Sequence, residues 1–285
     1  MIGGGAWGIG ERLTIALVQS LQGEILVELA GHVGHVVVDE CHHAPADAFS
    51  RVVSQFPARY LLGLSATPYR RDGLGAVIGY FLGSVVATMD ERALQDRLVK
   101  PHIIKRQTGL TVRGDSFTEL VSRLTTDSAR NALIVGDVAQ AVAEGRHCLV
   151  LSDRVEHVET LTTLLQDQGL TAAALHGKQG KRARGQVVAA AGTGELDVVV
   201  ATCALVGEGF DCPALDALFL ATPVSYVGRI VQYVGRVSRT APGKSDAVVY
   251  DYCDDHRMLW ASWRKRTAVY GDQRLGRSTL DPPRT

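Results

Sequence analysis

The sequence predicts an α/β protein made of two parallel-sheet domains, of which the first is incomplete. Short runs of β-branched and aliphatic residues alternate with helical stretches, a pattern typical of parallel strands joined by helical crossovers. The chain has 285 residues, enough for two such domains, and 46% of them are hydrophobic. Each domain can therefore bury a core.

The first domain is expected over residues 1–100. Its strand-like runs are residues 13–18, 35–39, 60–65 and 85–88, and residues 46–55 fit a short helix. Residues 101–127 then break the rhythm. Pro101 opens this segment, a polar strand candidate follows, and Arg113-Gly114-Asp115 predicts a turn. We therefore predict a domain junction over 101–127.

The second domain is expected over residues 128–255, where the alternation is regular. Five strands are predicted, at residues 148–152, 171–175, 197–202, 217–221 and 247–252. Four helices are predicted between them, over residues 130–143, 155–168, 181–191 and 226–234. Residues 256–285 carry seven Arg and Lys against two Asp, and are predicted to form a basic helix and tail. A solvated surface and a nucleic-acid contact explain these charges equally well.

The composition limits the partners. Lys and Arg equal Asp and Glu at 30 each, so no overall positive field attracts nucleic acid, and any such contact must be local. None of the five cysteines forms a Cys-x-x-Cys pair, which favours reduced thiols in the cytoplasm. No apolar run reaches the ~18 residues that a membrane span requires, so no membrane contact is expected.

Two adjacent carboxylates, Asp39 and Glu40, follow an apolar strand. Ligands of parallel sheets bind at the carboxyl ends of strands. There Asp39 can hold hydrated Mg²⁺, and Glu40, which points elsewhere, can act as a base toward a water molecule. A solvated acidic turn is the plainer interpretation. Zinc binding by Cys41, His42 and His43 is disfavoured, because adjacent ligands rarely converge on one ion.

Two further short segments carry polar or charged residues that could belong to a functional site. Ser65-Ala66-Thr67 ends the next strand, where its hydroxyls could bond to the region of His42. Near the other end of the sequence, Gln232 precedes Arg236 and Arg239. Guanidinium groups can neutralise charge on a transferring phosphate. For an isolated pair of arginines, a solvated helix end would be the usual explanation.

Taken in order, these strings resemble the motifs of superfamily 2 helicases and translocases. Asp39-Glu40-Cys41-His42 is similar to their Walker B box, and Ser65-Ala66-Thr67 to their coupling motif. His43 and Pro68-Tyr69-Arg70-Arg71 are most similar to the branch with DEAH-box repair helicases and restriction-enzyme motor subunits. Gln19 and Ser20 look like the motif that contacts the nucleic-acid backbone.

The second domain continues the resemblance. Cys148–Arg154 is similar to the fourth motif, Leu175-His176-Gly177-Lys178 to the histidine-glycine loop, Ala201–Pro213 to motif V and Gln232–Arg239 to motif VI. The resemblance implies two RecA-like domains around a cleft for ATP and Mg²⁺, with DNA a better expectation than RNA. The resemblance also implies that the backbone of the nucleic acid is contacted by Gln19, Ser20, Arg154, His176 and Thr202. It implies that the nucleotide is contacted by Gln232, Gly209 and Asp211, and that this site is coupled to the nucleic acid by His42, Ser65 and Thr67. Finally, it implies that Arg236 and Arg239 are arginine fingers, which act together with Asp39 and Glu40.

One expected motif is missing. The phosphate cradle Gly-x-x-x-x-Gly-Lys-Ser/Thr should precede residue 13, but Gly3–Gly10 contains no Lys, Ser or Thr. Gly243-Lys244-Ser245 is no substitute, because Ser238 stands where the first glycine is needed. A fragment with a late start, a decayed gene and a split motor whose partner chain supplies the cradle are the three explanations. We thus expect an ATP-dependent DNA helicase or translocase core that does not hydrolyse ATP alone. A non-catalytic nucleic-acid-binding or regulatory module is the alternative.

Overall fold

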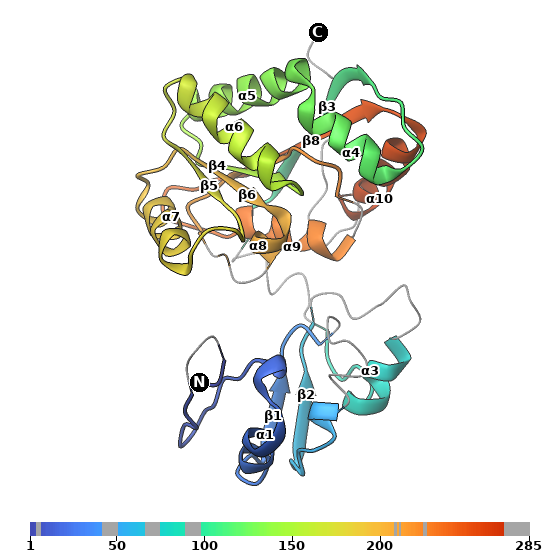
Figure 1. Cartoon of the computed structure of the whole chain (residues 1–285), viewed down its shortest axis with the longest axis vertical. Helices are drawn as coiled ribbons and strands as arrows, with labels where there is room; N and C mark the ends of the chain where they lie inside the picture. Colours follow the sequence, from blue (N-terminus) through green and yellow to red (C-terminus); the bar gives the residue numbers. More distant parts are fainter. Residues whose placement is uncertain are drawn as a thin grey trace. The chain divides into compact units, whose positions relative to one another are not determined.

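The computed structural model describes residues 1–3, 7–41, 51–65, 75–88, 98–207, 210, 212–224 and 227–270. The chain divides into two compact units, Met1–Met89 (unit 1) and Asp90–Thr285 (unit 2) (Figure 1). Each contains a parallel sheet with helices, which confirms the predicted fold class. Within the described ranges, none of the helices has the length and hydrophobicity needed to cross a bilayer.

Unit 1 contains a two-stranded parallel sheet. Strand β1 (His35–Val38) pairs with β2 (Tyr60–Gly63) in register from His35↔Tyr60 to Val38↔Gly63. The 3-10 turn η1 (Val18–Ser20) and the helices α1 (Gly23–Ala30) and α3 (Gly75–Leu82) complete the described elements. The core is small and is formed by Ile2, Leu21, Leu26, Leu29 and Val52.

Two strand predictions in unit 1 are wrong. Residues 13–18 form only an isolated bridge, Ile2↔Ala16, followed by η1, and residues 85–88 form no strand. Large apolar residues stand at every second position, 13, 15 and 17, as they would in a strand. Such a pattern forms a strand only where a neighbouring strand completes its backbone hydrogen bonds. Of the helix predicted over 46–55, residues 51–53 are helical, and residues 46–50 lie outside the described residues.

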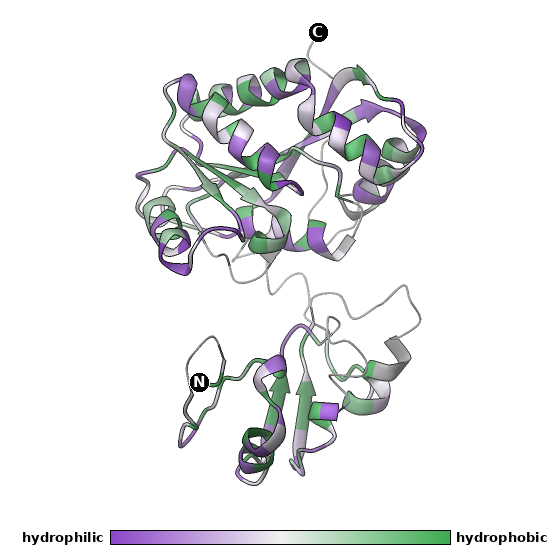
Figure 2. Cartoon of the chain, in the orientation of Figure 1, coloured by the Kyte–Doolittle hydropathy of each residue, from purple (hydrophilic) through white to green (hydrophobic). Residues whose placement is uncertain are grey.

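Unit 1 leaves an apolar face of its sheet uncovered. Val37, Tyr60 and Leu62 share that face and are 51%, 57% and 37% exposed. Sheets of parallel strands are normally covered on both faces. In the described part of the chain, every large hydrophobic residue that is exposed lies in unit 1, and Figure 2 shows how hydropathy is distributed along both units.

Unit 2 is a complete doubly wound fold. Its six parallel strands are ordered β3-β8-β7-β4-β6-β5. They are β3 (Pro101–Thr111), β4 (Cys148–Ser152), β5 (Ala172–Leu175), β6 (Val198–Thr202), β7 (Ala217–Leu220) and β8 (Ala247–Asp255). The helices are α4 (Phe117–Thr126), α5 (Ser128–Ala143), α6 (Val155–Asp167), α7 (Lys181–Thr193), α8 (Cys203–Gly207), α9 (Val227–Val237) and α10 (Arg257–Tyr270) (Figure 1).

The sheet of unit 2 separates two hydrophobic cores. Every residue of β4, β6 and β7 is buried, as expected for central strands covered on both faces. One core includes α9 residues such as Ile230 and Tyr233, and the other includes Ile134 of α5 and Val158 of α6. This burial holds the carboxyl ends of the strands in fixed positions.

The structure places residues 101–127, predicted as a junction, inside unit 2. They form edge strand β3, which pairs with β8, and helix α4, whose Leu120 and Leu124 pack with Val112 and Leu259. The misassignment has a physical cause. An edge strand pairs with a neighbour along one side only and is partly exposed to solvent. Strand β3 therefore carries polar residues, and its sequence resembles that of a linker. The basic segment after residue 256 likewise contains α10, which packs on β8.

Candidate functional site

The acidic pair of unit 1 lies on a tight turn at the carboxyl end of β1. Glu40 has φ of +47°, a left-handed conformation that non-glycine residues rarely adopt. Its N–H donates to Oδ1 of the exposed Asp39 at 2.9 Å. The turn is held on both sides, because Leu64 N–H donates to Val38 O and Cys41 N–H donates to Leu64 O. Such local strain is found most often at functional sites.

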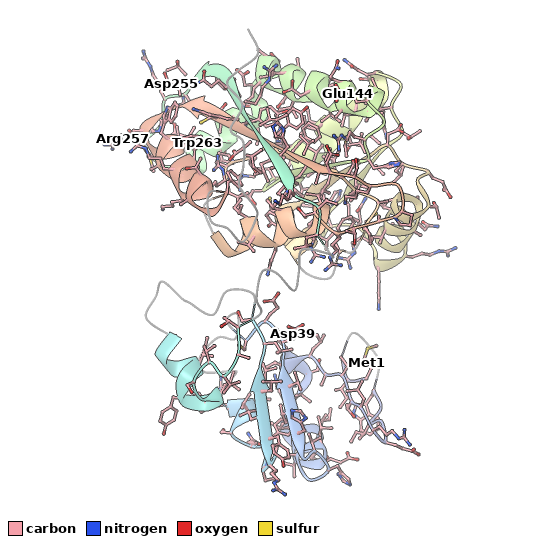
Figure 3. All side chains as sticks on the ribbon, turned by 180° about the vertical axis from the view of Figure 1, so that it is seen from behind. Met1, Asp39, Glu144, Asp255, Arg257 and Trp263 are labelled. Carbon is pink, nitrogen blue, oxygen red and sulfur yellow. The ribbon has the colours of Figure 1, made fainter. Side chains whose placement is uncertain are left out.

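This arrangement fits Mg²⁺ better than it fits zinc. Among the described residues, no group of three His, Cys, Asp or Glu side chains could hold a metal ion. Mg²⁺ is usually held by only one or two carboxylates, and phosphates and water complete its shell. The exposed Asp39 carboxylate (Figure 3) suits that role. Cys41 is a poor ligand, since it is buried and burial raises the pKa of its thiol.

Ser65 lies beside the acidic pair. It follows β2 after one intervening residue, Leu64, and the parallel register places the carboxyl end of β2 next to that of β1. The other two predicted coupling residues, His42 and Thr67, lie outside the described residues. Gln19 and Ser20 belong to the 3-10 turn η1, where Gln19 is exposed and Ser20 is partly exposed.

The residues of unit 2 that are predicted to contact nucleic acid lie at the carboxyl end of its sheet. Arg154 follows β4, His176 follows β5 and Thr202 ends β6, and these three strands are adjacent and parallel. Their burial differs. The His176 side chain is only 8% exposed, with its Nε2 3.5 Å from Glu159 Oε1, and Thr202 is buried as well. Arg154 is the most accessible of the three.

A buried polar network supports the segment that carries Arg154. The pKa of His157 is lowered to about 3 by burial and by the nearby Arg130, so its ring is neutral. Nε2–H then donates to Asn131 Oδ1 at 2.9 Å, and Nδ1 accepts from the Ser152 hydroxyl at 2.9 Å. The Ser152 oxygen in turn accepts from the Arg154 N–H at 3.2 Å.

Helix α9 is tied to the segment that follows β6. The hydroxyl of Tyr233, which is fully buried, donates to Cys203 O at 2.7 Å, and the Arg236 guanidinium donates to Phe210 O. Gly209 and Asp211, from the same segment, lie outside the described residues. Gln232 is partly buried in α9, while Arg239 is exposed just beyond the helix and bridges Leu98 through its backbone.

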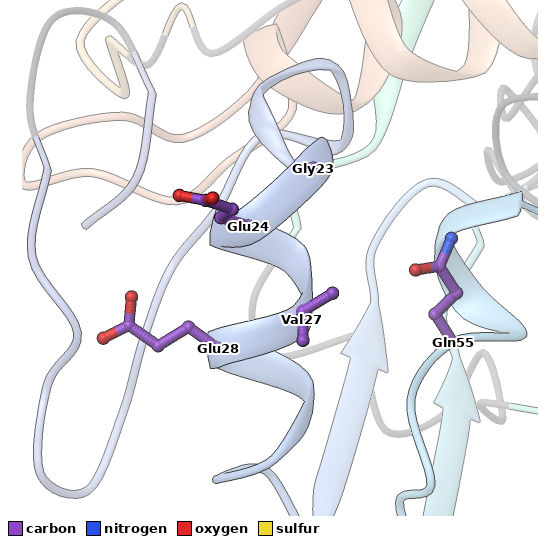
Figure 4. Close-up of a pocket in the computed structure, with 5 residues that line it drawn as sticks. All are labelled: Gly23, Glu24, Val27, Glu28 and Gln55. Carbon is purple, nitrogen blue, oxygen red and sulfur yellow. The ribbon is translucent and has the colours of Figure 1, made fainter.

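A surface pocket in unit 1 is not a competing site. It is lined by Gly23, Glu24, Val27 and Glu28 of α1 and by Gln55 (Figure 4). Glu24 and Glu28 project to one side of α1, and Val27 projects to the other (Figure 4). The polar groups therefore do not converge, and none of the predicted site residues lines the pocket.

Comparison with known proteins agrees with the geometry. The sequence profile of the helicase conserved C-terminal domain matches residues 130–241, and that of the type III restriction enzyme res subunit matches residues 9–70. A protein of Escherichia phage T5 named as a helicase, D10, is 26% identical over 285 residues, covering 99% of this chain and 62% of the relative. One of Acanthamoeba polyphaga mimivirus, named as an ATP-dependent RNA helicase, L396, is 25% identical over 231 residues, covering 78% and 43%.

A solved structure shows the same fold. It is a fragment of a type I restriction enzyme HsdR subunit from Vibrio vulnificus YJ016, with a TM-score of 0.72 and 18% identity, and it covers 93% of this chain and 50% of that one. The chain belongs to the superfamily 2 helicases. It spans less than two thirds of the length of each of these three proteins.

The family matches enclose the predicted motifs of this helicase-family chain. The restriction-enzyme match includes Asp39, Glu40 and Ser65, and the C-terminal-domain match includes the segments from Arg154 to Arg239. Strand β3 and helix α10 lie outside both matches, although both are integral to the fold of unit 2.

The sequence did not predict the buried polar residues that connect the elements at the carboxyl end of the unit 2 sheet. Arg130 and Asp254, each 1% exposed, pair at 2.8 Å, and Arg130 also donates to Ala221 O. Thr108 donates to the same Asp254 carboxylate at 2.6 Å. The sequence contained no clear signal for this pair, because Arg130 stands next to Asn131 and Asp254 next to Asp255, so neither charge interrupts an apolar run.

Proposed function

We propose that this chain is the core of an ATP-dependent DNA helicase or translocase. The observation that carries the proposal is the strained acidic turn, in which Glu40 is held left-handed at the carboxyl end of β1 beside Asp39 and Ser65. Membership of the helicase superfamily supports the reaction class. The use of ATP and Mg²⁺, and of DNA rather than RNA, are parts of the proposal.

The residues divide the chemistry among them. Asp39 would hold Mg²⁺, which supplies neutralisation of phosphate charge when bound. Glu40, held in its left-handed turn next to Asp39, would accept a proton from the attacking water. Arg236 and Arg239 donate to phosphoryl oxygens of the nucleotide, with Gln232, Gly209 and Asp211 near it. His42, Ser65 and Thr67 couple this site to the nucleic acid.

Nucleic acid is the proposed macromolecular partner. Its backbone is contacted by Gln19, Ser20, Arg154, His176 and Thr202. The exposed Gln19 and the accessible Arg154 can make such contacts directly, whereas the buried His176 requires a side-chain rearrangement. Contacts to phosphates make binding salt-dependent and largely independent of sequence.

The triphosphate needs a cradle that the described residues do not form. We propose that a polypeptide segment with such a loop, from the same polypeptide or from a partner chain, packs on unit 1. The apolar face at Val37, Tyr60 and Leu62 supports this, because a segment packed there would bury it. A two-stranded sheet alone is also only marginally stable.

An ATPase assay tests the proposal. The chain is measured alone, with single-stranded DNA, and after addition of a polypeptide that carries a Gly-x-x-x-x-Gly-Lys-Thr loop and packs on unit 1. Hydrolysis that requires the added segment and that Glu40→Gln abolishes supports the proposal. Robust hydrolysis by the chain alone would contradict the need for the segment.

The alternative is a non-catalytic nucleic-acid-binding or regulatory module. The lack of a Gly-x-x-x-x-Gly-Lys string in the sequence favours it. DNA binding without hydrolysis under every condition of the assay would select this function.

The cysteines bear on the compartment. All five are free and buried. Burial raises the pKa values of Cys41 and Cys203, so these thiols are unreactive. We place the protein in the cytoplasm on this basis.

A further inference from the structure

A basic and aromatic surface lies on α10 and the adjoining edge strand β3. We call it the α10 patch and define it by Lys105, Arg257, Trp260, Trp263 and Arg264. It lies outside both family matches and contains none of the predicted site residues. Figure 3 shows Arg257 and Trp263 on the side of unit 2 away from Glu144.

The two indoles form a fixed corner. Their ring centroids are 5.7 Å apart at an interplanar angle of 81°, and Lys105 Nζ lies 4.2 Å from the Trp263 centroid and 4.6 Å from that of Trp260. Trp260 Nε1–H donates to Asp255 Oδ1 at 3.4 Å. Because these contacts restrain both side chains, little conformational entropy would be lost if a flat ligand stacked on them.

The orientation of α10 is set by a buried ion pair. Arg266 and Asp251 are 2% and 1% exposed, their closest contact is 2.8 Å, and the Tyr270 hydroxyl donates to the same carboxylate at 2.8 Å. On α10 itself, Arg266 and Tyr270 form the buried stripe of the helix together with Leu259 and Ser262. The opposite stripe is therefore held toward solvent.

That exposed stripe places two arginines next to the indoles. With 3.6 residues per turn, Arg257 and Arg264 project within roughly 60° of Trp260 around the helix axis. Both are exposed, whereas the indoles are partly exposed. In the described part of the chain, neither arginine takes part in a salt bridge, and α10 itself contains no Asp or Glu. Asp255 is the carboxylate that faces the patch.

Packing alone explains only part of this arrangement. Lys105 stacked on two indoles would suffice to hold β3 against α10, and Arg266 anchors the helix to β8. Neither contact requires two further arginines beside incompletely covered rings. Cations next to aromatic rings are, however, what single-stranded nucleic acid binds, since its phosphates are anionic and its unpaired bases can stack.

We infer that the α10 patch binds single-stranded nucleic acid, with bases stacked on Trp260 and Trp263 and phosphates bound by Arg257 and Arg264. The inference rests on the proposed function, because it adds a binding surface to a nucleic-acid motor core. The paired bases of a duplex are already stacked on one another, so duplex DNA engages only the arginines.

Intrinsic fluorescence can isolate the patch. The chain contains three tryptophans, so Trp7→Phe leaves only Trp260 and Trp263 as reporters. This variant is titrated with oligothymidylate, with duplex DNA and with heparin, which is anionic but has no bases. Fluorescence anisotropy of a dye-labelled oligothymidylate measures overall binding in parallel. We expect quenching by oligothymidylate and little by duplex or heparin.

A charge-reversal pair supplies the control. Arg264→Glu and Lys265→Glu make the same change at adjacent exposed positions of α10, but Lys265 projects about 100° further around the axis, away from Trp260. We expect Arg264→Glu to bind oligothymidylate more weakly than Lys265→Glu. Trp260→Ala should lose about fivefold or more in affinity. The two surface variants keep the test valid if Trp260→Ala does not fold.

The outcomes separate the two proposals. If anisotropy detects no binding to the unmodified chain, nucleic-acid binding itself is refuted, and the patch with it. If binding persists without quenching and the two Glu variants bind equally, the patch assignment is overturned and the proposed function stands. Equal quenching by heparin would overturn base stacking.

Discussion

Acidification should destabilise unit 2 through His157. The ring is neutral between Asn131 and Ser152, and its pKa falls from 6.5 to about 3 on folding because of burial. The unfolded chain therefore binds a proton at a higher pH than the folded one does. The stabilisation is fully present above pH 6.5 and is lost progressively as the pH falls toward 3.

The size of this effect follows from the shift. Each unit of pH between the unfolded and folded pKa values costs about 1.4 kcal/mol. Between pH 7 and pH 5 the loss is thus about 2 kcal/mol, a large fraction of the stability of a typical domain. Protonation would also turn Nδ1 into a donor toward Ser152, so the hydrogen bond that supports the Arg154 segment must rearrange.

Urea unfolding of the whole chain at pH 7 and pH 5, followed by circular dichroism, measures the effect. His157→Gln is the control, because it keeps a polar side chain and removes the titrating ring, while all other groups titrate as before. Between pH 7 and pH 5, the free energy of unfolding should fall by about 2 kcal/mol more in the unmodified protein than in the variant. Equal losses in the two proteins would refute the assignment of a buried neutral imidazole.

Three further changes test other parts of the structure. Arg266→Met leaves the buried Asp251 carboxylate unpaired and should lower the free energy of unfolding by about 3 kcal/mol or more in urea titrations. Gly63→Ala brings a Cβ to 2.5 Å from Leu82 Cδ1 and 3.1 Å from Cys41 Sγ. In thermal unfolding, the free energy of unfolding of unit 1 should therefore fall by about 1–3 kcal/mol. Arg154→Ala should weaken single-stranded DNA binding and reduce its logarithmic salt slope by about 0.7, whereas an unchanged slope would exclude a phosphate contact.

Much of the fold could be predicted because its local patterns are strong. The strands β4, β6 and β7 are continuous apolar runs, and the helices between them have clear periodicity. Unit 1 was harder, since its alternating residues at 13–17 find no partner strand. Edge strand β3 was missed for the opposite reason, because pairing with β8 compensates for a polar sequence.

The roles of the candidate site residues stay predictions, and the sequence supplied only part of their structural setting. The choice of Asp39, Glu40, Arg236 and Arg239 as candidates follows from the order of short motifs. The burial of His176 and Thr202 could not be foreseen, because it depends on packing against residues such as Glu159 of another element. The support of Arg154 through His157 and Asn131 was hidden for the same reason.

Sequence alone was sufficient for the parallel α/β class, membership of the helicase superfamily and the position of each motif along the chain, since these depend on residue order and periodicity. Tertiary structure decided the left-handed turn at Glu40, the neutral His157, the uncovered face of β1 and β2, and the orientation of α10. Each of these depends on which distant residues exclude water or complete a hydrogen bond, and no local pattern contains that information.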